Sequence, residues 1–564
     1  MEENRISGAQ AMLLSLEKEG VTTIFGYPGG TIMPLYDKLY DFGDKIRHIL
    51  VRHEQGAVHA SQGYARATGK VGVCIATAGP GATNLVTGIA DAMMDSTPIV
   101  CITAQVGFDN LGNNFFQEAD TISITIPVTK WSYQITKASE IASVMAKAFY
   151  IAQNGRPGPV LISFTKNAQT EFTAFDYKHY KNPTAKSQLP GDSICSDIEQ
   201  AIKLINRSKK PLIIAGQGVL LSGACDQLMA LSVKGNIPLV TTLLGISTIP
   251  TCYPLYCGFA GMHGTVTANR AVQQCDLLIA IGMRFSDRVT GEVKGFAPSA
   301  NIIHIDIDKA EFNKCVQSNI NLLGDAGLIM TKIMSKVEYQ PHNKWLEYLE
   351  NIRKGEQDKI DTSYMNVDTD NGMASAVAKI AGYAGQNRIV VTDVGKHQMF
   401  CARFSKFHSP RTFITSGGLG TMGFGLPAAI GAKLGKPGSE VVLFCGDGGF
   451  QMSIQELGTI MSNNIDIKIV ILNNSYLGMV RQWQELFFDD RYSFTKLDNP
   501  DFVKIAQAYG IPASRAEIPS GLEKNLEKMF NSKGPYLLEV LVGQKENIFP
   551  MVPAGATLDK MITK

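Results

Sequence analysis

Short apolar segments alternate with helical segments along most of the 564-residue chain. Residues 70–77, 98–103 and 160–164 have the continuous apolar character of buried strands, and residues 84–94 are predicted to be helical. Such strands, joined by helices, are typical of parallel sheets, because crossover helices cover a parallel sheet on both faces. We therefore predict an α/β fold built on parallel sheets.

The alternation forms three blocks, and at roughly 100–200 residues per domain the chain has room for three or four domains. Polar stretches near residues 168–192 and 340–370 are predicted to connect the blocks. The other predicted strands are residues 21–25, 46–51, 211–215, 237–241, 275–281, 301–307, 389–392, 441–445, 467–472 and 536–541. We expect three doubly wound parallel-sheet domains, at residues 1–175, 190–345 and 370–564.

The balance of charge argues against a protein that binds nucleic acid or a membrane surface. The chain has 53 basic and 51 acidic residues, whereas such partners demand a concentrated basic face. No apolar run approaches the ~20 residues that span a bilayer. The ten cysteines form no CxxC pair, and the acidic N-terminus does not resemble a signal peptide. We expect reduced thiols and a cytoplasmic location.

The third block carries the most informative motif. The apolar strand 441–445 runs directly into Gly446-Asp447-Gly448, and the next strand, 467–472, ends in Asn473-Asn474. One strand–helix–strand crossover separates the two motifs, so both lie on the same edge of a parallel sheet. A carboxylate, an amide oxygen and a backbone carbonyl are ligands that Mg²⁺ prefers, and glycines let the backbone approach phosphates. A lone Gly-Asp-Gly would more often be an ordinary turn, but the paired motifs favour a metal and diphosphate site.

This pair of motifs resembles the signature of the thiamin-diphosphate enzymes. Over essentially the whole chain the sequence is similar to the catalytic large subunits of acetohydroxyacid synthase (acetolactate synthase), notably at residues 417–423, 479–484 and 550–556. The resemblance implies that Asp447, Asn474 and the Tyr476 carbonyl bind Mg²⁺ and that Met422 holds the cofactor in a bent conformation. The residues implied to bind thiamin diphosphate are Pro28, Gly29, Val394, Gly395, Lys396, His397, Gly420, Met422, Gly446, Gly448, Gly449 and Met479.

Glu54, which follows the predicted strand 46–51, is implied to be the catalytic acid. A carboxyl group at the cofactor's aminopyrimidine favours the imino tautomer that removes the thiazolium proton. Taken alone, Glu54 also fits a surface or helix-capping glutamate. In the family this residue pairs with the metal site of a second subunit, so the resemblance implies a homodimer or a larger homo-oligomer. Gln117 and Lys166 are the other catalytic residues that the family likeness implies.

Glycine-rich loops and two arginines in the middle block could bind a second diphosphate, and an acid at the end of strand 301–307 suits a ribose. In their order they resemble the FAD domain of biosynthetic acetohydroxyacid synthases. The implied FAD-binding residues are Gly216, Gln217, Gly218, Gly261, Met262, His263, Gly264, Gly282, Arg284, Asp287, Arg288, Asp306 and Asp325. Gly418-x-Gly420-x-x-Gly423 also fits a dinucleotide fingerprint, but no acidic residue follows at the required distance, which makes a dehydrogenase a poor interpretation.

Four side chains are implied to contact the keto acids: Phe116, Arg284, Met479 and Trp483. Arg284 suits a bidentate pair with a carboxylate, and Trp483 suits an apolar wall that favours ethyl over methyl groups. Phe116 and Trp483 are also compatible with a plain core role. The chain departs from the family's usual residues at Asn113-Asn114-Phe115, Thr165, Asn167, Ser286, Lys396 and Phe400. These departures leave the acceptor preference open.

The resemblance implies that the chain decarboxylates pyruvate and transfers the hydroxyethyl unit to a second 2-keto acid. Pyruvate as acceptor gives 2-acetolactate and 2-ketobutyrate gives 2-aceto-2-hydroxybutyrate, both precursors of branched-chain amino acids. The alternatives are a pyruvate oxidase, a keto-acid decarboxylase, a flavin-free catabolic acetolactate synthase, and a non-catalytic regulatory or binding paralogue. The cofactors expected are thiamin diphosphate, Mg²⁺ and FAD, and the family likeness adds a small regulatory subunit as a partner.

Overall fold

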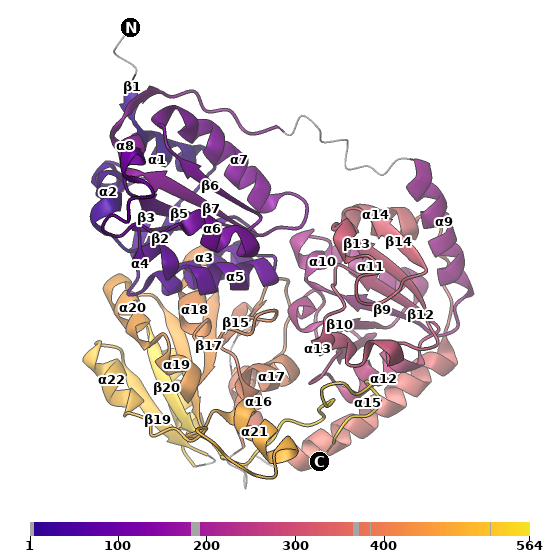
Figure 1. Cartoon of the computed structure of the whole chain (residues 1–564). Coiled ribbons are helices and arrows are strands. Elements are labelled where there is room, and N and C mark those ends of the chain that lie inside the picture. Colours follow the sequence, from indigo (N-terminus) through magenta and orange to yellow (C-terminus); the bar gives the residue numbers. More distant parts are fainter. Residues whose placement is uncertain (1–4, 182–191, 365–371, 384, 519, 564) are drawn as a thin grey trace.

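Three six-stranded sheets organise the protein, as a computed structural model shows for residues 5–181, 192–364, 372–383, 385–518 and 520–563 (Figure 1). All neighbouring strands within each of these sheets are parallel, and helices flank each sheet. The predicted fold class, three α/β parallel-sheet domains, is confirmed.

The N-terminal sheet has the strand order β3-β2-β4-β5-β7-β6. Its strands are β2 (Thr23–Gly26), β3 (Arg47–Leu50), β4 (Gly72–Ala76), β5 (Ile99–Gln105), β6 (Trp131–Ile135) and β7 (Pro159–Thr165). Its helices are α1 (Gly8–Lys18), α2 (Met33–Tyr40), α3 (Glu54–Thr68), α4 (Pro80–Thr83), α5 (Val86–Met94), α6 (Thr121–Thr125), α7 (Ile141–Gln153) and α8 (Lys166–Thr170). A short strand, β8 (Phe172–Ala174), pairs antiparallel with β1 (Arg5–Ser7). The prediction that the linker begins near residue 168 was therefore wrong, because α8 and β8 still belong to this domain; residues 182–191 lie outside the described residues.

The middle sheet has the strand order β11-β10-β9-β12-β13-β14. Its strands are β9 (Pro211–Ala215), β10 (Leu239–Thr241), β11 (Tyr256–Phe259), β12 (Leu277–Ile281), β13 (Asn301–Asp306) and β14 (Ile320–Leu323). Its helices are α9 (Asp192–Arg207), α10 (Gln217–Leu221), α11 (Cys225–Gly235), α12 (Val266–Gln274), α13 (Asp287–Thr290), α14 (Ala326–Met334) and α15 (Asn343–Tyr364). The predicted second connection is partly helical, since α15 occupies most of it.

The C-terminal sheet has the strand order β16-β15-β17-β18-β20-β19. Its strands are β15 (Arg388–Thr392), β16 (Phe413–Ile414), β17 (Glu440–Gly446), β18 (Ile467–Asn473), β19 (Ala513–Glu517) and β20 (Tyr536–Leu541). Its helices are α16 (Met373–Tyr383), α17 (Lys396–Phe404), α18 (Gly425–Gly435), α19 (Asp447–Gln451), α20 (Leu457–Asn463), α21 (Gly478–Phe487), α22 (Phe502–Ala508) and α23 (Leu522–Asn531).

Alternate side chains of the central strands enter different apolar cores. In β17, Val441 and Leu443 lie in one core whereas Val442 and Phe444 lie in another. The core that contains Val441 also contains Ile99 of the N-terminal sheet, so two sheets share it. This arrangement explains why the central strands are apolar throughout, because helices pack against both faces of each sheet.

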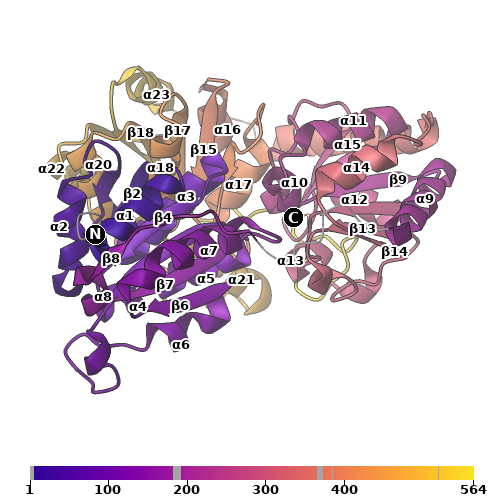
Figure 2. The same cartoon turned by 90° about the horizontal axis from the view of Figure 1, so that it is seen from above.

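Helices α3 and α18 fill the shared core and bring the N- and C-terminal domains together (Figure 2). They touch through their backbones, because a Cβ atom on Gly431 would lie only 1.8 Å from the Ala60 carbonyl oxygen, and one on Gly63 would lie 2.0 Å from that of Ala428. The middle domain lies beside this pair (Figures 1 and 2). The C-terminal segment reaches it, with the Val552 amide donating to the Met262 carbonyl at 2.8 Å. Among the described residues, no helix combines the length and apolarity required to cross a bilayer.

Replacing Gly431 by alanine should separate α3 from α18 and lower the free energy of unfolding by about 1–3 kcal/mol, because the added methyl group overpacks the core. Thermal unfolding would show this as a lower melting temperature. Gly382→Ala is the matched control, since a Cβ atom at this helical position meets nothing within 4 Å. Equal melting temperatures for the two variants would contradict the proposed backbone contact.

Candidate functional site

The loops that follow β15, β17 and β18 meet at one edge of the C-terminal sheet. Gly446 pairs with Leu472, so Asp447 and Asn474 leave adjacent parallel strands close to each other. Asp447 is the first residue of α19, and both side chains are almost completely buried. The edge therefore presents one carboxylate and one amide oxygen to a shared space.

Asp447 is a buried acid in a polar setting. Its Oδ2 accepts a 2.7 Å hydrogen bond from Asn499 Nδ2, and the same nitrogen donates to Asn473 Oδ1 at 3.0 Å. Burial raises the pKa of Asp447 to about 6, and the hydrogen bond from Asn499 opposes that shift. A buried carboxylate gains from a nearby cation, which favours its charged form. Asn474 Oδ1 accepts the backbone N–H of Tyr476 at 3.2 Å, which brings Tyr476 to the same loop.

A narrow cradle lies between the loops after β15 and β17. Gly395 has φ +152°, and a Cβ atom there or on Gly446 would lie 3.0–3.3 Å from the ring of His397. Burial lowers the pKa of His397 to about 4, which keeps the ring neutral, and its Nε2 has no hydrogen-bond partner among the described residues. The glycine-backed amides of this space suit a phosphate oxygen, and the unpaired ring nitrogen marks a polar site that the described residues leave without a partner.

The ammonium group of Lys396, by contrast, bonds to residues of the C-terminal segment. It donates to the Glu546 carbonyl at 2.6 Å and to Asn547 Oδ1 at 3.1 Å. Asn547 in turn donates to Glu485 Oε1 on α21 at 2.7 Å. The side chain of Lys396 thus ties the C-terminal segment to this edge of the sheet.

Met422 lies at the same edge, because its Cε is 3.7 Å from where a Cβ atom on Gly448 would stand. Gly449 approaches Asp393, with 2.3 Å between its added Cβ position and Asp393 Oδ1. Asp393 accepts the backbone N–H groups of Gly423 at 3.0–3.1 Å and of Gly425 at 2.8 Å, and so fixes the chain on either side of Phe424. The loop that carries Met422 is therefore tied to the end of β15.

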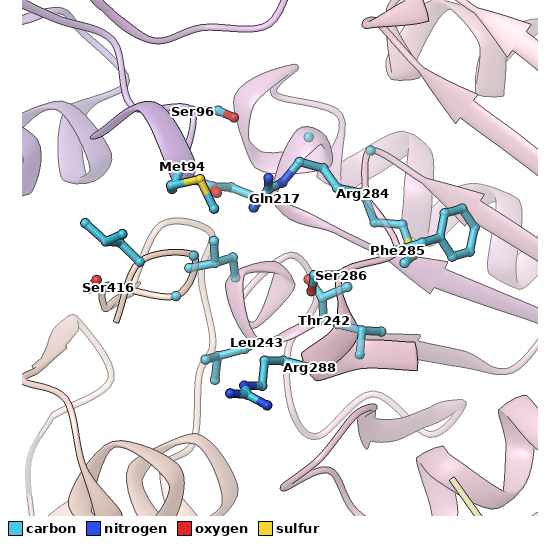
Figure 3. Close-up of a pocket in the computed structure, with 18 of the residues that line it drawn as sticks. Met94, Ser96, Gln217, Thr242, Leu243, Arg284, Phe285, Ser286, Arg288 and Ser416 are labelled. Carbon is cyan, nitrogen blue, oxygen red and sulfur yellow. The ribbon is translucent and has the colours of Figure 1, made fainter. Parts of the chain in front are cut away.

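A cavity of about 1030 Å³ extends from this edge into the middle domain. All three domains line it: Met94 and Ser96 come from the first, Gln217 and Arg284 from the second, and Ser416 from the third (Figure 3). The predicted residues that line it are Gln217, Gly218, Met262, His263, Gly282, Arg284, Asp287, Arg288, Asp306, Asp325, Val394, Gly395, Gly420, Met422, Met479 and Trp483. The cavity thus brings together residues predicted for FAD with residues predicted for thiamin diphosphate and the keto acids.

In the middle domain the predicted glycines have a geometric role. A Cβ atom on Gly216 would lie 2.2 Å from the Gly282 carbonyl oxygen, and one on Gly261 would lie 2.3 Å from that of Arg288. The first contact lets the loops after β9 and β12 close on each other, and the second brings the loop after β11 against α13. Gly264 belongs to the same turn, because its amide donates to the Gly261 carbonyl at 2.9 Å.

The polar groups that line the cavity differ in how their hydrogen-bonding capacity is used. His263 Nδ1 is buried without a hydrogen-bond partner among the described residues, and burial lowers the pKa of His263 to about 3. Arg288 lies 6.0 Å from the ring of Trp483, a cation–π distance. Asp325 caps α14 and accepts from Ser222 Oγ at 2.7 Å, so part of its hydrogen-bonding capacity serves the fold.

A second group of predicted residues gathers at the carboxyl edge of the N-terminal sheet. Glu54 begins α3, and its Oε2 accepts a 2.9 Å hydrogen bond from Asn84 Nδ2. The loop after β4 connects them, because a Cβ atom on Gly81 would lie 3.3 Å from Glu54 Oε1, and one on Gly79 would lie 2.9 Å from Gln117. A Cβ atom on Gly29 would lie 2.5 Å from Thr77 of the same loop, and Pro28 directly precedes Gly29. Glu54, Gln117 and Gly29 therefore form a second group of predicted residues around this loop.

Two predicted residues stand apart from both groups. Phe116 is 85% exposed, and Lys166 is exposed at the start of α8. Within the described part of the chain, neither a hydrogen bond nor the cavity connects Glu54 with Asp447. One chain thus carries two separate groups of predicted residues.

Three polar residues at these edges were not predicted: Asn84, Asp393 and Asn499. Asp393 directly follows a buried strand, as Asp447 does, so the rule that identified Asp447 would also have identified Asp393. Asn84 and Asn499 reach their partners from distant parts of the chain, and no local pattern marks them.

The donor set at Asp447 fits Mg²⁺ through oxygen ligands of different kinds. Among the residues that the structure describes, no three His, Cys, Asp or Glu side chains cluster as a metal site, so a metal here takes one carboxylate and depends on the amide, the carbonyl and an anionic ligand. The unpaired His397 and His263 nitrogens fit a diphosphate at the cradle and a polar cofactor in the cavity.

Three protein-family descriptions match the chain. They are "Thiamine pyrophosphate enzyme, N-terminal TPP binding domain" at residues 6–124, the "central domain" of the same enzymes at 198–333, and the "C-terminal TPP binding domain" at 393–540.

Characterised relatives cover the chain almost completely. The acetolactate synthase isozyme 2 large subunit of Escherichia coli is 44% identical over 562 residues, which are 99% of this chain and 100% of that protein. The acetolactate synthase large subunit of Corynebacterium glutamicum is 45% identical over 98% of this chain and 89% of its own. That of Lactococcus lactis is 43% identical over 99% and 96%.

Asp447→Asn should weaken the binding of thiamin diphosphate with Mg²⁺ by about 100-fold or more, because removing one charge of a buried ion pair costs about 3–5 kcal/mol. Calorimetric titration with and without EDTA measures this, and removal of the metal should weaken the wild type to a similar degree. Asp501→Asn, at the half-buried cap of α22, is the control. Wild-type affinity in Asp447→Asn would place the metal elsewhere.

Proposed function

Because the chain belongs to the thiamine pyrophosphate enzymes, and among them to the acetolactate synthase large subunits, we propose that it decarboxylates pyruvate and joins the remaining two-carbon unit to a second 2-keto acid. The products are 2-acetolactate from a second pyruvate and 2-aceto-2-hydroxybutyrate from 2-ketobutyrate, on the route to branched-chain amino acids. The full-length likeness to acetolactate synthase large subunits carries this conclusion.

The C-terminal edge supplies the binding groups. Asp447, Asn474 and the Tyr476 carbonyl would hold Mg²⁺, while His397 and the backbone of Gly395 would hold the diphosphate. The chemistry that thiamin diphosphate supplies when bound is a nucleophilic carbon that also accepts the electrons released by decarboxylation. Glu54 would hold a proton at the aminopyrimidine ring, and Asn84 keeps the carboxyl group of Glu54 in place.

The keto acids would meet the mouth of the cavity. Arg284 can pair with a carboxylate through two parallel hydrogen bonds, and Trp483 offers an apolar wall beside Met479. Such a wall distinguishes an ethyl from a methyl acceptor by about 1–3 kcal/mol per methylene group. Gln117 lies in the group around Glu54. Phe116 and Lys166 are assigned to the reaction by the family likeness alone. A closed site also excludes water, which would otherwise protonate the two-carbon unit before the second keto acid accepts it.

FAD is the second cofactor that we assign. The support is a long cavity between the middle and C-terminal domains, loops closed on Gly216 and Gly282, and an unpaired buried nitrogen on His263. Gln217, Arg284 and Arg288 offer donors along that cavity. Residues of this middle domain thus favour a synthase that contains FAD over a flavin-free one.

The active unit that we propose is a homodimer or larger, located in the cytoplasm and joined by a small regulatory subunit. The separation of the Glu54 group from the Asp447 group on one chain supports the dimer, in which each group would be a half-site completed by the other chain. The relatives named large subunits support the regulatory partner. All ten cysteines are free thiols, as expected for a reducing compartment.

The decisive assay measures products from pyruvate with Mg²⁺ and thiamin diphosphate, with and without added FAD. Acetolactate that forms only when FAD is added to thiamin diphosphate and Mg²⁺ is the expected result. Acetaldehyde or acetyl phosphate as the main product would reject carboligation in favour of a decarboxylase or an oxidase. Acetolactate that forms without any flavin would reject the assignment of FAD and leave the carboligation proposal standing. A protein that consumes no keto acid, even with a small subunit added, would reject the proposed activity.

Mixing two inactive variants tests the shared site. Glu54→Ala and Asp447→Ala should each lose nearly all acetolactate formation, whereas an unfolded and refolded mixture should recover about a quarter of wild-type activity. Half of the random dimers are mixed, and each mixed dimer has one intact site of two. Each variant refolded alone is the control. A mixture that stays inactive would show that Glu54 and Asp447 act within one chain.

A further inference from the structure

The loop that leads from β16 to α18 is held almost entirely by side chains from other elements. This loop, residues 415–423 and called the glycine-rich loop below, forms neither helix nor strand and contains four glycines. Glycine gives a chain so much freedom that such a loop does not fix its own shape. It nevertheless lines the cavity from Ser416 to Gly420 and carries Met422. Its shape must therefore come from its contacts.

Asp95, the residue that ends α5 in the N-terminal domain, holds the first half of the loop. Its Oδ1 accepts the Gly418 amide at 2.6 Å, and its Oδ2 accepts the Gly417 amide at 3.0 Å. Arg66 Nη1 donates to Oδ2 at 3.1 Å and to the Thr415 carbonyl at 2.6 Å, so it bridges the acid and the loop. The fit is close, because a Cβ atom on Gly418 would lie 2.7 Å from Asp95 Oδ1.

Asp91, one turn earlier on α5, holds the second half. Its Oδ1 accepts both the Ser416 hydroxyl and the Thr421 hydroxyl, the latter at 2.8 Å. The Thr421 amide donates to Ser416 Oγ at 2.9 Å, which closes the loop on itself. Asp91 therefore fixes the residue that directly precedes Met422.

The two acids differ in how their oxygens are used. Both oxygens of Asp95 accept hydrogen bonds, whereas Oδ2 of Asp91 accepts none and lies beside Gln62, whose Oε1 is also without a partner among the described residues. Burial raises the pKa of both carboxyl groups, and the Arg66 charge opposes this shift. An amide at position 91 would keep the acceptor for Ser416 and Thr421.

We infer that Asp91 and Asp95 are positioning residues that hold the glycine-rich loop, and through it Met422, in the shape that binds thiamin diphosphate. This inference rests on the proposed function, because Met422 is assigned to the cofactor there. The acids reach the loop from the N-terminal domain of the same chain, so the packing of the two domains sets the shape of the cofactor site.

Calorimetric titration of thiamin diphosphate into the purified protein with Mg²⁺ tests the inference on four variants. Asp95→Asn and Asp91→Ala should raise the dissociation constant about ten-fold or more, because each leaves buried donors of the loop without an acceptor. Asp91→Asn should change it less than about two-fold, since the amide oxygen replaces Oδ1. Asp276→Asn, whose carboxylate accepts three hydrogen bonds in the middle domain, is the control and should bind as the wild type does.

Thr421→Val provides a milder change, should Asp91→Ala fail to fold. It removes the loop hydroxyl that Asp91 accepts, so Thr421→Val by itself should weaken the binding of thiamin diphosphate. In the Asp91→Asn background it should weaken binding by the same factor as in the wild type. In the Asp91→Ala background, where the acceptor is already lost, it should cause no further weakening. A general loss of stability would instead lower the melting temperature of the cofactor-free protein without this coupling. Wild-type affinity in Asp95→Asn, or equal losses in Asp91→Asn and Asp91→Ala, would overturn the inference. Wild-type protein that forms no acetolactate would reject the proposed function instead.

Discussion

In each of the three large sheets, every strand leaves the sheet at the same edge, because neighbouring strands run in the same direction. The loops after β15, β17 and β18 therefore converge, and Asp447, Asn474 and His397 meet although they are far apart in the chain. The same geometry gathers Glu54 and Gln117 at the edge of the N-terminal sheet and the glycine loops at the edge of the middle sheet. Parallel pairing thus creates the half-sites before any ligand is considered.

Buried carboxylates then connect what the sheets bring close. Asp393 ties the chain around Met422 to β15, and Asp91 and Asp95 tie the preceding loop to the first domain. Glu456 of the C-terminal domain in turn holds the segment around Glu54 in the N-terminal domain. It accepts the Arg52 amide at 3.0 Å, and a Cβ atom on Gly56 would lie 2.5 Å from its Oε1. Asp393, Asp95 and Glu456 accept backbone N–H groups that would otherwise be buried without a partner, and Asp91 accepts two buried hydroxyl groups. These contacts join the N- and C-terminal domains on both sides of the packed helices α3 and α18.

The fold could be predicted from the sequence as far as burial determined the strands. Every central strand is apolar on both faces and was predicted, whereas β6, β11, β14, β16 and β19, all at sheet edges, were missed. Edge strands bury less and carry polar residues, as in β19, or are only two residues long, as in β16. The motifs around Asp447 and Asn474 were visible because they directly follow buried strands. Asn84 and Asn499 reach partners 30 and 52 residues away within their own domains. The acids of α5 reach a loop of another domain, and no local pattern records such contacts. Lys396 was predicted at the diphosphate, but its ammonium turns to residues 546–547, a distant segment that the sequence pattern could not reveal.

The central claim is that one metal site forms where Asp447 and Asn474 meet, and that Glu54 completes it from a second chain. A crystal structure of the protein with thiamin diphosphate, FAD and Mn²⁺ in place of Mg²⁺ would test both parts, because anomalous scattering locates the metal directly. The account predicts a metal bound by Asp447, the Asn474 side chain and the Tyr476 carbonyl, with Glu54 of another protomer at the aminopyrimidine ring. A metal bound by other residues, or Glu54 of the same chain at the ring, would contradict it.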